Sequence, residues 1–200
     1  PLNELNNRRI YTLFNVRYHK EIKNIKNLIS IDPKINSICL KFHDNVYKWY
    51  GERIYTNYVN NVNHGGALNI SCHEIDLLLY ITQTIPSDWK IIDKMEIYNK
   101  INSSLEDTID INLFSEKNQI NAYISLSLIS KIRERYIELF TNKNDLFYKK
   151  DLDNFQENDN WANTYKRMWK DILYEEDKIF ATGLDGIINS NFCQKIKQCQ

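Results

Sequence analysis

The sequence has 200 residues, of which 42% are hydrophobic and 26% are charged, and this balance indicates a globular protein and excludes a disordered one. Its 26 basic and 26 acidic side chains cancel to a formal net charge of zero, so it lacks the overall basic excess typical of nucleic-acid-binding proteins. No apolar run approaches the roughly 18 residues that span a membrane, and no signal-peptide pattern is visible.

Glycine and proline are scarce, with 5 and 3 residues, which is too few for the many turns of a β-sandwich. The length suits one hydrophobic core rather than two. We therefore expect a single all-α domain over residues 1–200, a bundle of seven to eight helices around a central apolar helix. The abundance of isoleucine and asparagine indicates an AT-rich genome, such as that of a large DNA virus or an apicomplexan parasite.

Apolar residues at spacings of three and four predict a first helix over Arg8–Ile29. Asp32–Pro33 follows, with an N-cap residue before a proline at the first helical position, and predicts a second helix that ends near Tyr50. A third, shorter helix is expected over Ile54–Val62.

The middle of the chain begins with the loop Asn63-His64-Gly65-Gly66. Ser71 and Glu74 have the spacing of a capping box, which predicts a helix that ends before Pro86. Ser87 can cap a further helix that runs to Ile101. The segment Ile109–Leu113 alternates like a strand, but it is too short and isolated to build a sheet, so we expect an extended connector.

The most apolar segment is Asn118–Phe140, and we expect it to form the central buried helix of the bundle. The polar segment Asn142–Asn160 predicts a long loop. Trp161–Ile172 has the pattern of an amphipathic helix. Gly183 and Gly186 are expected to break the chain before a last short helix over 188–196.

A metal site could use His64, Cys72 and His73. On a helix, however, adjacent Cys72 and His73 point about 100° apart and cannot easily share one ion. The sequence also lacks the C-x-x-C, H-x-x-x-H and H-E-x-x-H spacings of metal sites. We therefore assign no metal ligand and expect no cofactor.

Catalysis has two candidate patterns. Asp93, Glu96 and Lys100 are residue types found in metal-dependent nucleases, which leaves a nuclease or related viral enzyme as an alternative function. On the predicted helix their spacing instead favours a solvated row of ion pairs. His64-Gly65-Gly66 resembles part of a hydrolase oxyanion loop, but no G-x-S-x-G motif accompanies it. We assign no catalytic residue and expect a protein that is not an enzyme.

Aromatic residues are abundant, with 13 Tyr and 4 Trp, and such side chains carry much of the binding energy at protein interfaces. We take Tyr47, Trp49, Tyr55 and Tyr58 as candidate binding residues. The alternative is that they belong to the core, with only their polar atoms reaching the surface. They lie at several angles around their helices, so burial of all four is not expected.

The segment Leu40–Ile54 resembles the poxvirus Bcl-2-like family of intracellular immune-evasion proteins. The resemblance lies in Lys41-Phe42-x-Asp44, then Tyr50-Gly51, then an isoleucine that begins the next helix. It implies a Bcl-2-like bundle without catalysis that binds a host signalling adaptor or apoptotic regulator in the host cytoplasm. It also implies a possible homodimer through the first and sixth helices, where the exposed aromatic residues would be Tyr11, Tyr18, Tyr165 and Trp169.

The four cysteines are too sparse for a disulfide scaffold, which favours a reducing compartment. Cys193 and Cys199 could pair only if the chain turns between them. Such a disulfide would favour another alternative, an exported or surface-exposed helical scaffold protein of a parasite. The main expectation remains a non-catalytic viral inhibitor of innate-immune signalling or apoptosis, with no nucleic-acid partner and no membrane span.

Overall fold

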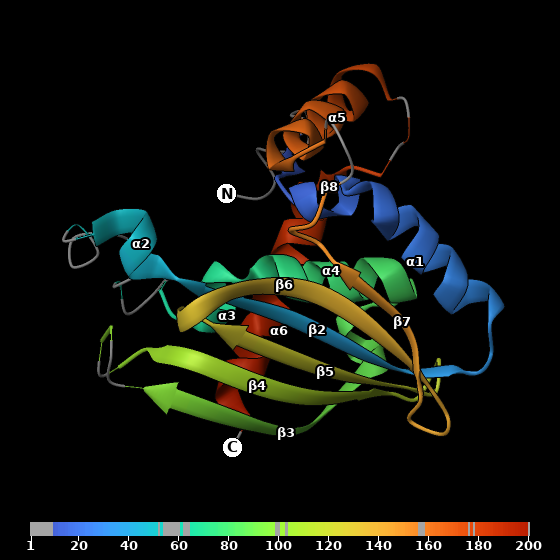
Figure 1. The fold of residues 1–200 in the computed structure, drawn as a ribbon, viewed down its shortest axis with the longest axis horizontal. Helices are drawn as coiled ribbons and strands as arrows, with labels where there is room; N and C mark the ends of the chain where they lie inside the picture. Colours follow the sequence, from blue (N-terminus) through green and yellow to red (C-terminus); the bar gives the residue numbers. More distant parts are fainter. Residues whose placement is uncertain are drawn as a thin grey trace.

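The computed structural model describes residues 10–51, 53, 61, 65–98, 101, 102, 104–155, 159–175, 177 and 179–199. A six-stranded β-sheet lies at its centre, so the expectation of an all-α bundle is wrong (Figure 1). From one edge to the other, the strands are β3 (Trp89–Tyr98), β4 (Glu106–Ser115), β5 (Ile120–Ser127), β2 (Ile35–Asn45), β6 (Ile129–Thr141) and β7 (Leu146–Asp151).

The sheet is mostly antiparallel. Only β2 and β5 pair in parallel, with Ser37 opposite Asn121 and Phe42 opposite Leu126, and the other four pairs are antiparallel. A second, two-stranded sheet joins β1 (Tyr11–Thr12) to β8 (Ala181–Thr182), which directly precedes the last helix.

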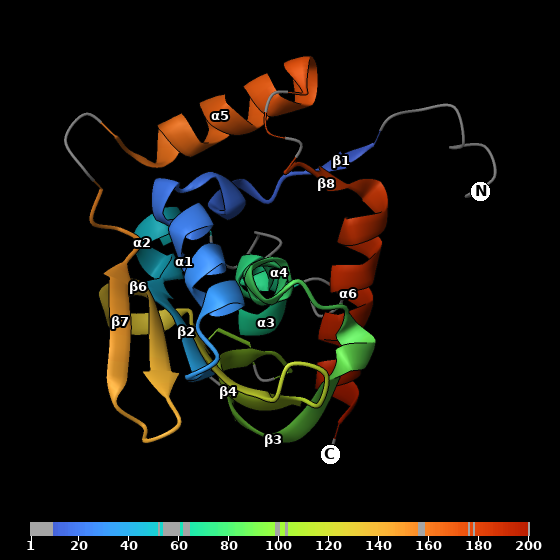
Figure 2. The same cartoon turned by 90° about the vertical axis from the view of Figure 1, so that its right-hand side faces the viewer.

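The helices lie on one side of the large sheet (Figure 2). Helix α4 packs between the sheet and the helices α1 and α6, and α5 packs on η2. In the described part of the chain, no helix covers the opposite side of the sheet. The helices are η2 (Asn15–Tyr18), α1 (Lys20–Ile31), α2 (Val46–Tyr50), α3 (Ala67–Ile70), α4 (Cys72–Thr82), η5 (Pro86–Asp88), α5 (Trp161–Tyr174) and α6 (Gly183–Gln198).

The second expected helix is mainly strand β2. Its apolar residues fit helical spacing, but Ile38, Leu40 and Phe42 also alternate with more polar residues. These three side chains are buried on the helix-covered side, while Cys39 and Lys41 point to the other side. β-Branched and aromatic residues suit a half-buried strand. β2 also pairs with β5 on one edge and with β6 on the other, and this pairing stabilises the segment as a strand.

The expected central helix over residues 118–140 is a pair of strands. β5 and β6 meet at Leu128, which is fully buried, and the two strands flank β2 on opposite edges. The expected connector at Ile109–Leu113 is the middle of β4, the expected helix after Ser87 is β3, and part of the expected loop over 142–160 is β7. In each of these segments the structure has a strand whose partners are distant in the sequence, whereas the prediction used neighbouring residues alone.

Several helical predictions agree with the structure. α4 and α5 occupy the segments expected, and α1 covers the second half of the first predicted helix. Other details differ. Ser71 makes no capping hydrogen bond, and α6 begins at Gly183, where Thr182 and Asp185 cap each other. The expected break at the two glycines is therefore wrong.

Two ion pairs fix α4 within the core. Glu74 and Asp76 on this helix are both buried. The Arg135 Nε atom of β6 donates to Glu74 at 2.8 Å, and the Arg17 Nε atom of η2 donates to Asp76 at 2.8 Å. The Arg135 guanidinium also lies over the rings of Phe42 and Trp161, at 4.9 and 4.8 Å. A carboxylate buried without such a partner would be strongly destabilising, so α4 depends on both arginines.

The Gly65-Gly66 loop brings the backbone close to a buried carboxylate. Glu106 accepts a hydrogen bond from the Leu68 backbone N–H at 3.1 Å and pairs with Lys197 at 3.3 Å. Gly66 has φ of +89°, and a Cβ atom added there would lie 2.6 Å from the Glu106 carboxylate oxygens. The position therefore requires glycine for both backbone and steric reasons.

We expect Gly66→Ala to lower the free energy of unfolding by at least about 2 kcal/mol more than Gly51→Ala. Gly51 is the matched control, because its φ is also positive, +54°, but no atom lies within 4 Å of an added Cβ. Urea unfolding followed by circular dichroism measures both variants. Equal losses would mean that the Glu106 contact does not constrain the loop.

His19 is a buried histidine that begins helix α1. Its Nδ1 atom accepts from the Glu21 backbone N–H at 3.2 Å, and within the described residues its Nε2 atom has no hydrogen-bond partner. Burial lowers the pKa of His19 to about 4, and the nearby Lys150 charge adds to this effect. The folded protein therefore holds this imidazole in its neutral form.

The unfolded chain should bind a proton at this histidine near pH 6.5, whereas the folded chain binds it only near pH 4. Stability from this group is thus complete above pH 6.5 and is lost as the pH falls toward 4. We expect His19→Asn, which keeps a capping oxygen, to reduce the stability lost between pH 7 and 4.5 by about 2 kcal/mol. Urea unfolding at both pH values tests this, and parallel curves for the variant and the parent would contradict it.

No helix of the described residues is both long enough and apolar enough to cross a membrane.

Candidate protein-binding surface

No helix of the described residues covers the side of the sheet that faces away from α1, α4 and α6, and we call this side the open face. Strand register defines its members, because residues directly opposite one another on paired strands share a face. They include Ser37, Cys39, Lys41 and His43 of β2, Asp93, Met95 and Ile97 of β3, Asp110 and Asn112 of β4, Tyr123 and Ser125 of β5, Glu134, Tyr136, Glu138 and Phe140 of β6, and Leu146 and Lys149 of β7.

The charged groups at the centre of the open face are already paired with one another. Lys41 forms an ion pair with Glu134 at 2.8 Å, and Lys149 pairs with Glu138 at 2.6 Å. Both lysine ammonium groups also lie over the Tyr136 ring, at 5.4 and 4.2 Å from its centroid. These two lysines and two glutamates therefore neutralise one another, whereas Asp110 on β4 keeps one buried carboxylate oxygen without a hydrogen-bond partner in the described residues.

Hydrogen bonds extend this network across the neighbouring strands. The His43 Nε2 atom and the Ser125 hydroxyl lie 2.8 Å apart, which joins β2 to β5. The Asn112 amide donates to Asp93 at 2.6 Å, which joins β4 to β3. Burial lowers the pKa of His43, with Lys41 adding to the effect, so the imidazole is neutral at neutral pH.

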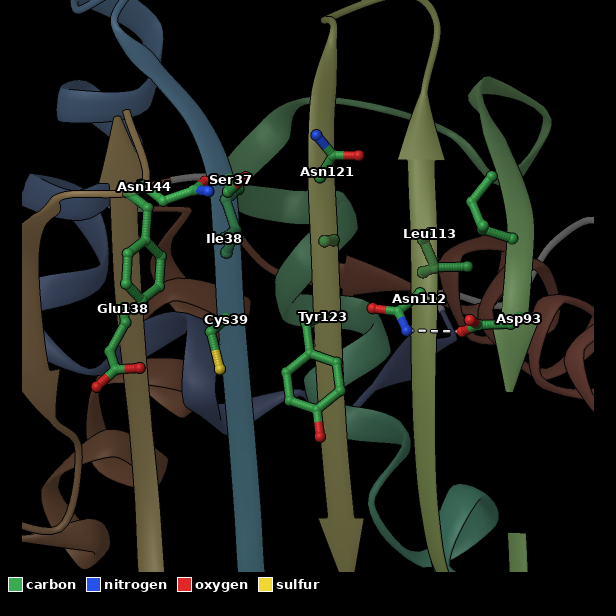
Figure 3. A pocket seen from close by; sticks show the side chains of 13 residues that line it. Ser37, Ile38, Cys39, Asp93, Asn112, Leu113, Asn121, Tyr123, Glu138 and Asn144 are labelled. Carbon is green, nitrogen blue, oxygen red and sulfur yellow. Dashed lines mark hydrogen bonds between the residues drawn. The ribbon is translucent and has the colours of Figure 1, made fainter. Parts of the chain in front are cut away.

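A shallow cavity of about 530 Å³ is hollowed into the open face. Figure 3 shows Glu138, Cys39, Tyr123 and Asn112 side by side on four strands along its floor. Its lining is more hydrocarbon than polar, and the Tyr123 ring projects from the sheet beside the Cys39 thiol. Such a hollow suits an inserted side chain of a partner better than a charged small molecule.

Exposed apolar side chains border the open face. Met95 and Ile97 on β3 are 57% and 46% exposed, and Leu146 on β7 is 54% exposed. Both strands are also edges of the sheet. An exposed sheet edge with apolar side chains is prone to pair with another chain. Burial of these border residues against a partner would therefore contribute most to the stability of a complex.

The aromatic residues predicted as binding sites lie elsewhere. Tyr47 and Trp49 are on the short helix α2, half-buried and packed against the core. The Trp49 indole N–H donates to the buried Asp44 carboxylate at 3.1 Å. Tyr55 and Tyr58 lie outside the described residues. The four-residue binding site is not assembled by the part of the chain that the structure describes.

The aromatic residues predicted for a dimer face are divided between surface and interior. Tyr165 and Trp169 on α5 are 44% and 49% exposed. Tyr18 is only 4% exposed, and its hydroxyl donates to Asp171 at 2.7 Å. Tyr11 packs edge-on against Phe180 at 5.1 Å. Tyr165 and Trp169 on α5 remain a predicted dimer face, whereas Tyr18 is a buried residue and is not available to a partner.

The residues considered for metal or nuclease chemistry are not brought together. Asp93 lies on the open face, whereas Glu96 pairs with Lys94 on the helix-covered side of β3. Lys100 and His64 lie outside the described residues. His73 packs edge-on against Phe14, and no cluster of three or more His, Cys, Asp or Glu side chains in the described part of the chain could hold a metal ion.

No residue of the open face was predicted from the sequence as a binding residue, although Asp93 was considered for nuclease chemistry and Lys41 is part of the Bcl-2-like motif. The signal was the alternation of Ser37, Cys39 and Lys41 with buried Ile38 and Leu40, which also fits a helix over so short a stretch. The alternation in β4 was visible but was judged too isolated to form a sheet. The partners that complete the sheet lie far away in the sequence.

No protein-family model and no curated protein sequence matches the chain. Solved structures do share its fold. Gal80p from Saccharomyces cerevisiae, a super-repressor mutant, has a TM-score of 0.68 and 16% identity over 95% of this chain. The WlbA dehydrogenase from Bordetella pertussis, solved with NADH and UDP-GlcNAcA, has a TM-score of 0.66 and 13% identity over 95% of this chain. The myo-inositol 2-dehydrogenase from Lactobacillus plantarum has a TM-score of 0.64 and 12% identity over 92%.

The chain shares its fold with oxidoreductases and with Gal80p. It spans 60 to 62% of the length of these three structures. The expected function of a Bcl-2-like inhibitor of immune signalling or apoptosis is therefore wrong, because it required an all-α bundle. The helical parasite scaffold falls with it, because it relied on the same helical layout. The nuclease alternative loses its residues instead, because Asp93 and Glu96 lie on opposite sides of β3.

Cys39 gives the open face a chemical probe. Burial raises the pKa of its thiol to about 11, and the Glu138 carboxylate adds to this effect. Only the thiolate reacts with iodoacetamide, so at pH 8 we expect alkylation about 100-fold slower than for a thiol of ordinary pKa. Peptide mass spectrometry across pH 7–11 measures the rate, which should still rise above pH 9.

Glu138→Gln removes the second cause of the raised pKa and should increase the alkylation rate of Cys39 at pH 8. The size of this increase measures how much the Glu138 charge, as distinct from burial, raises the pKa of the Cys39 thiol. A rate that levels off below pH 9 in the parent protein would contradict the expected pKa of the Cys39 thiol.

Proposed function

We propose that this chain is a protein-association domain that binds through the open face of its sheet, and that the partner is a second copy of the same chain. The observation that carries the proposal is the uncovered face itself, with its internally paired charges and its exposed apolar borders. A sheet face left without a covering layer is unusual when it has apolar residues to bury.

The size of the open face suits a stable interface. Six strands about 4.8 Å apart and about eight residues long, at about 3.3 Å per residue, give about 750 Å². A standard interface buries about 800 Å² on each partner. Two such faces can pack against each other about 10 Å apart, as in a β-sandwich.

Symmetry favours a second copy as the partner. The pairs Lys41–Glu134 and Lys149–Glu138 are satisfied within one face, so they require no opposite charge from a partner. Asp93 and Asp110 give the face a small acidic excess, so the attraction between two copies comes from the apolar borders. Closed twofold dimers, in which the same patch meets itself, are the commonest oligomers.

The similarity to dehydrogenases gives the fold but not a reaction. These 200 residues contain no G-x-G-x-x-G motif, which dinucleotide-binding sheets use to hold the pyrophosphate. The sheet is also mainly antiparallel, with one parallel pair in the described residues. The proposal therefore relies on the surface of this chain and assigns no hydride transfer to it.

We expect the parent chain to be dimeric by sedimentation equilibrium at micromolar concentration. The double variant Met95→Lys/Ile97→Lys should weaken the dimer at least about 10-fold, because it places two charges where apolar side chains would be buried. Both side chains are exposed in the protomer, so circular dichroism should remain unchanged.

Leu173→Lys is the matched control, because Leu173 is 67% exposed on α5 and lies off the open face. It should leave the dimer unchanged, and Trp169→Lys tests the dimer face predicted from sequence. A parent chain that is monomeric at 100 µM, or a dimer that only the α5 variants weaken, would overturn the proposal.

A further inference from the structure

A second cavity lies on the helical side of the molecule, away from the open face. It has a volume of about 360 Å³ and is bordered by η2, α1, α4 and α5. Five of its lining side chains are cationic, and we call it the basic cavity: Arg17, Lys20, Lys23, Lys26 and Arg167. The whole chain has no net charge, so this is a local concentration of positive charge.

The two arginines are held in place by carboxylates outside the cavity lining. Arg17 contacts Asp76 through two nitrogens, at 2.8 and 2.5 Å, and its side chain is only 10% exposed. Arg167 donates to the Tyr18 carbonyl at 2.8 Å and to Asp159 at 3.0 Å. Both guanidinium groups are therefore fixed, which lowers the entropy that a ligand would lose on binding.

The three lysines lie along one side of α1, at successive spacings of three residues. Lys20 lies 3.7 Å from Asp159. In the described part of the chain, no carboxylate lies within ion-pair distance of Lys23 or Lys26. The Lys26 ammonium instead lies 4.2 Å from the centroid of the Tyr80 ring, and Arg17 flanks the same ring at 4.9 Å. Burial and the Arg17 charge lower the pKa of Lys26, so positive charges crowd each other here.

The carboxylates near the cavity leave two of these cations unpaired. Asp76 and Asp159 pair with the arginines, Asp177 belongs to the lining, and Asp171 lies behind it, where it accepts from the Tyr18 hydroxyl and the Ile179 backbone N–H. Lys23 and Lys26 have no carboxylate within ion-pair distance in the described residues, and this excess of two positive charges matches a dianion. The Tyr80 ring and the Ile179 side chain provide an apolar part of the wall. The volume lies within the range of small-molecule sites.

We propose that the basic cavity binds a small organic phosphate. The phosphate dianion lies among Lys20, Lys23 and Lys26, and the organic part packs against Tyr80 and Ile179. A phosphate monoester carries close to two negative charges at neutral pH and accepts several charge-assisted hydrogen bonds, whereas a single carboxylate would neutralise only half of the excess.

Phenyl phosphate is the probe, measured by isothermal titration calorimetry with the whole chain in low salt. We expect it to bind, and we expect phenol, which lacks the charge, to give no binding. Lys23→Gln and Lys26→Gln should each weaken binding at least about 10-fold, and Lys26→Arg should stay within about threefold of the parent.

Lys195→Gln is the control for net charge, because Lys195 is an exposed lysine of α6 outside the cavity lining. It should bind phenyl phosphate like the parent. If Lys26→Gln alters the circular dichroism spectrum, Lys23→Gln alone tests the phosphate site, because Lys23 is exposed and its replacement should not disturb the fold. No binding by the parent, equal binding of phenol, or equal weakening by Lys195→Gln would each overturn the proposal. Met95→Lys/Ile97→Lys should bind like the parent, which separates this result from the association of the open face.

Discussion

The structure depends on the neutralisation of two carboxylates that α4 carries into the core. Glu74 and Asp76 are almost fully buried, and without partners each would cost several kcal/mol. Arg135 from β6 and Arg17 from η2 supply those partners from opposite directions. This requirement fixes α4 between the sheet and the outer helical layer, so one face of the sheet is fully covered.

The position of α4 and the other helices gives the two faces of the sheet different side-chain compositions. The covered face is an apolar core with a few charges, each held by a partner. The open face carries charged and aromatic side chains, among them two lysine–glutamate pairs, with apolar residues at its borders. Five cationic side chains gather beyond the covered face, around the basic cavity. Association and anion binding are thus proposed for opposite sides of one core.

The resemblance to Bcl-2-like proteins illustrates how a short motif can mislead. Lys41, Phe42 and Asp44 are predicted to lie within the second helix, but they lie on β2, where Lys41 is on the open face and Phe42 is in the core. Tyr50-Gly51 does end a helix, because Gly51 adopts a positive φ after α2. The motif therefore identified a real local stop, and the fold drawn from it was wrong.

Two helices could be predicted from residues that are close together in the chain. Helix α5 follows from its amphipathic pattern and from Asn160, whose side chain caps it, and α4 follows from its own apolar run. The strands could not be predicted in this way, because a strand is stabilised by partners elsewhere in the chain. β2 pairs with β5 more than eighty residues later, as in Ser37 and Asn121, and no window around β2 contains that information. The open face exists only after that pairing, and the basic cavity likewise collects side chains from segments that are remote in sequence, around η2, α1, α4 and α5.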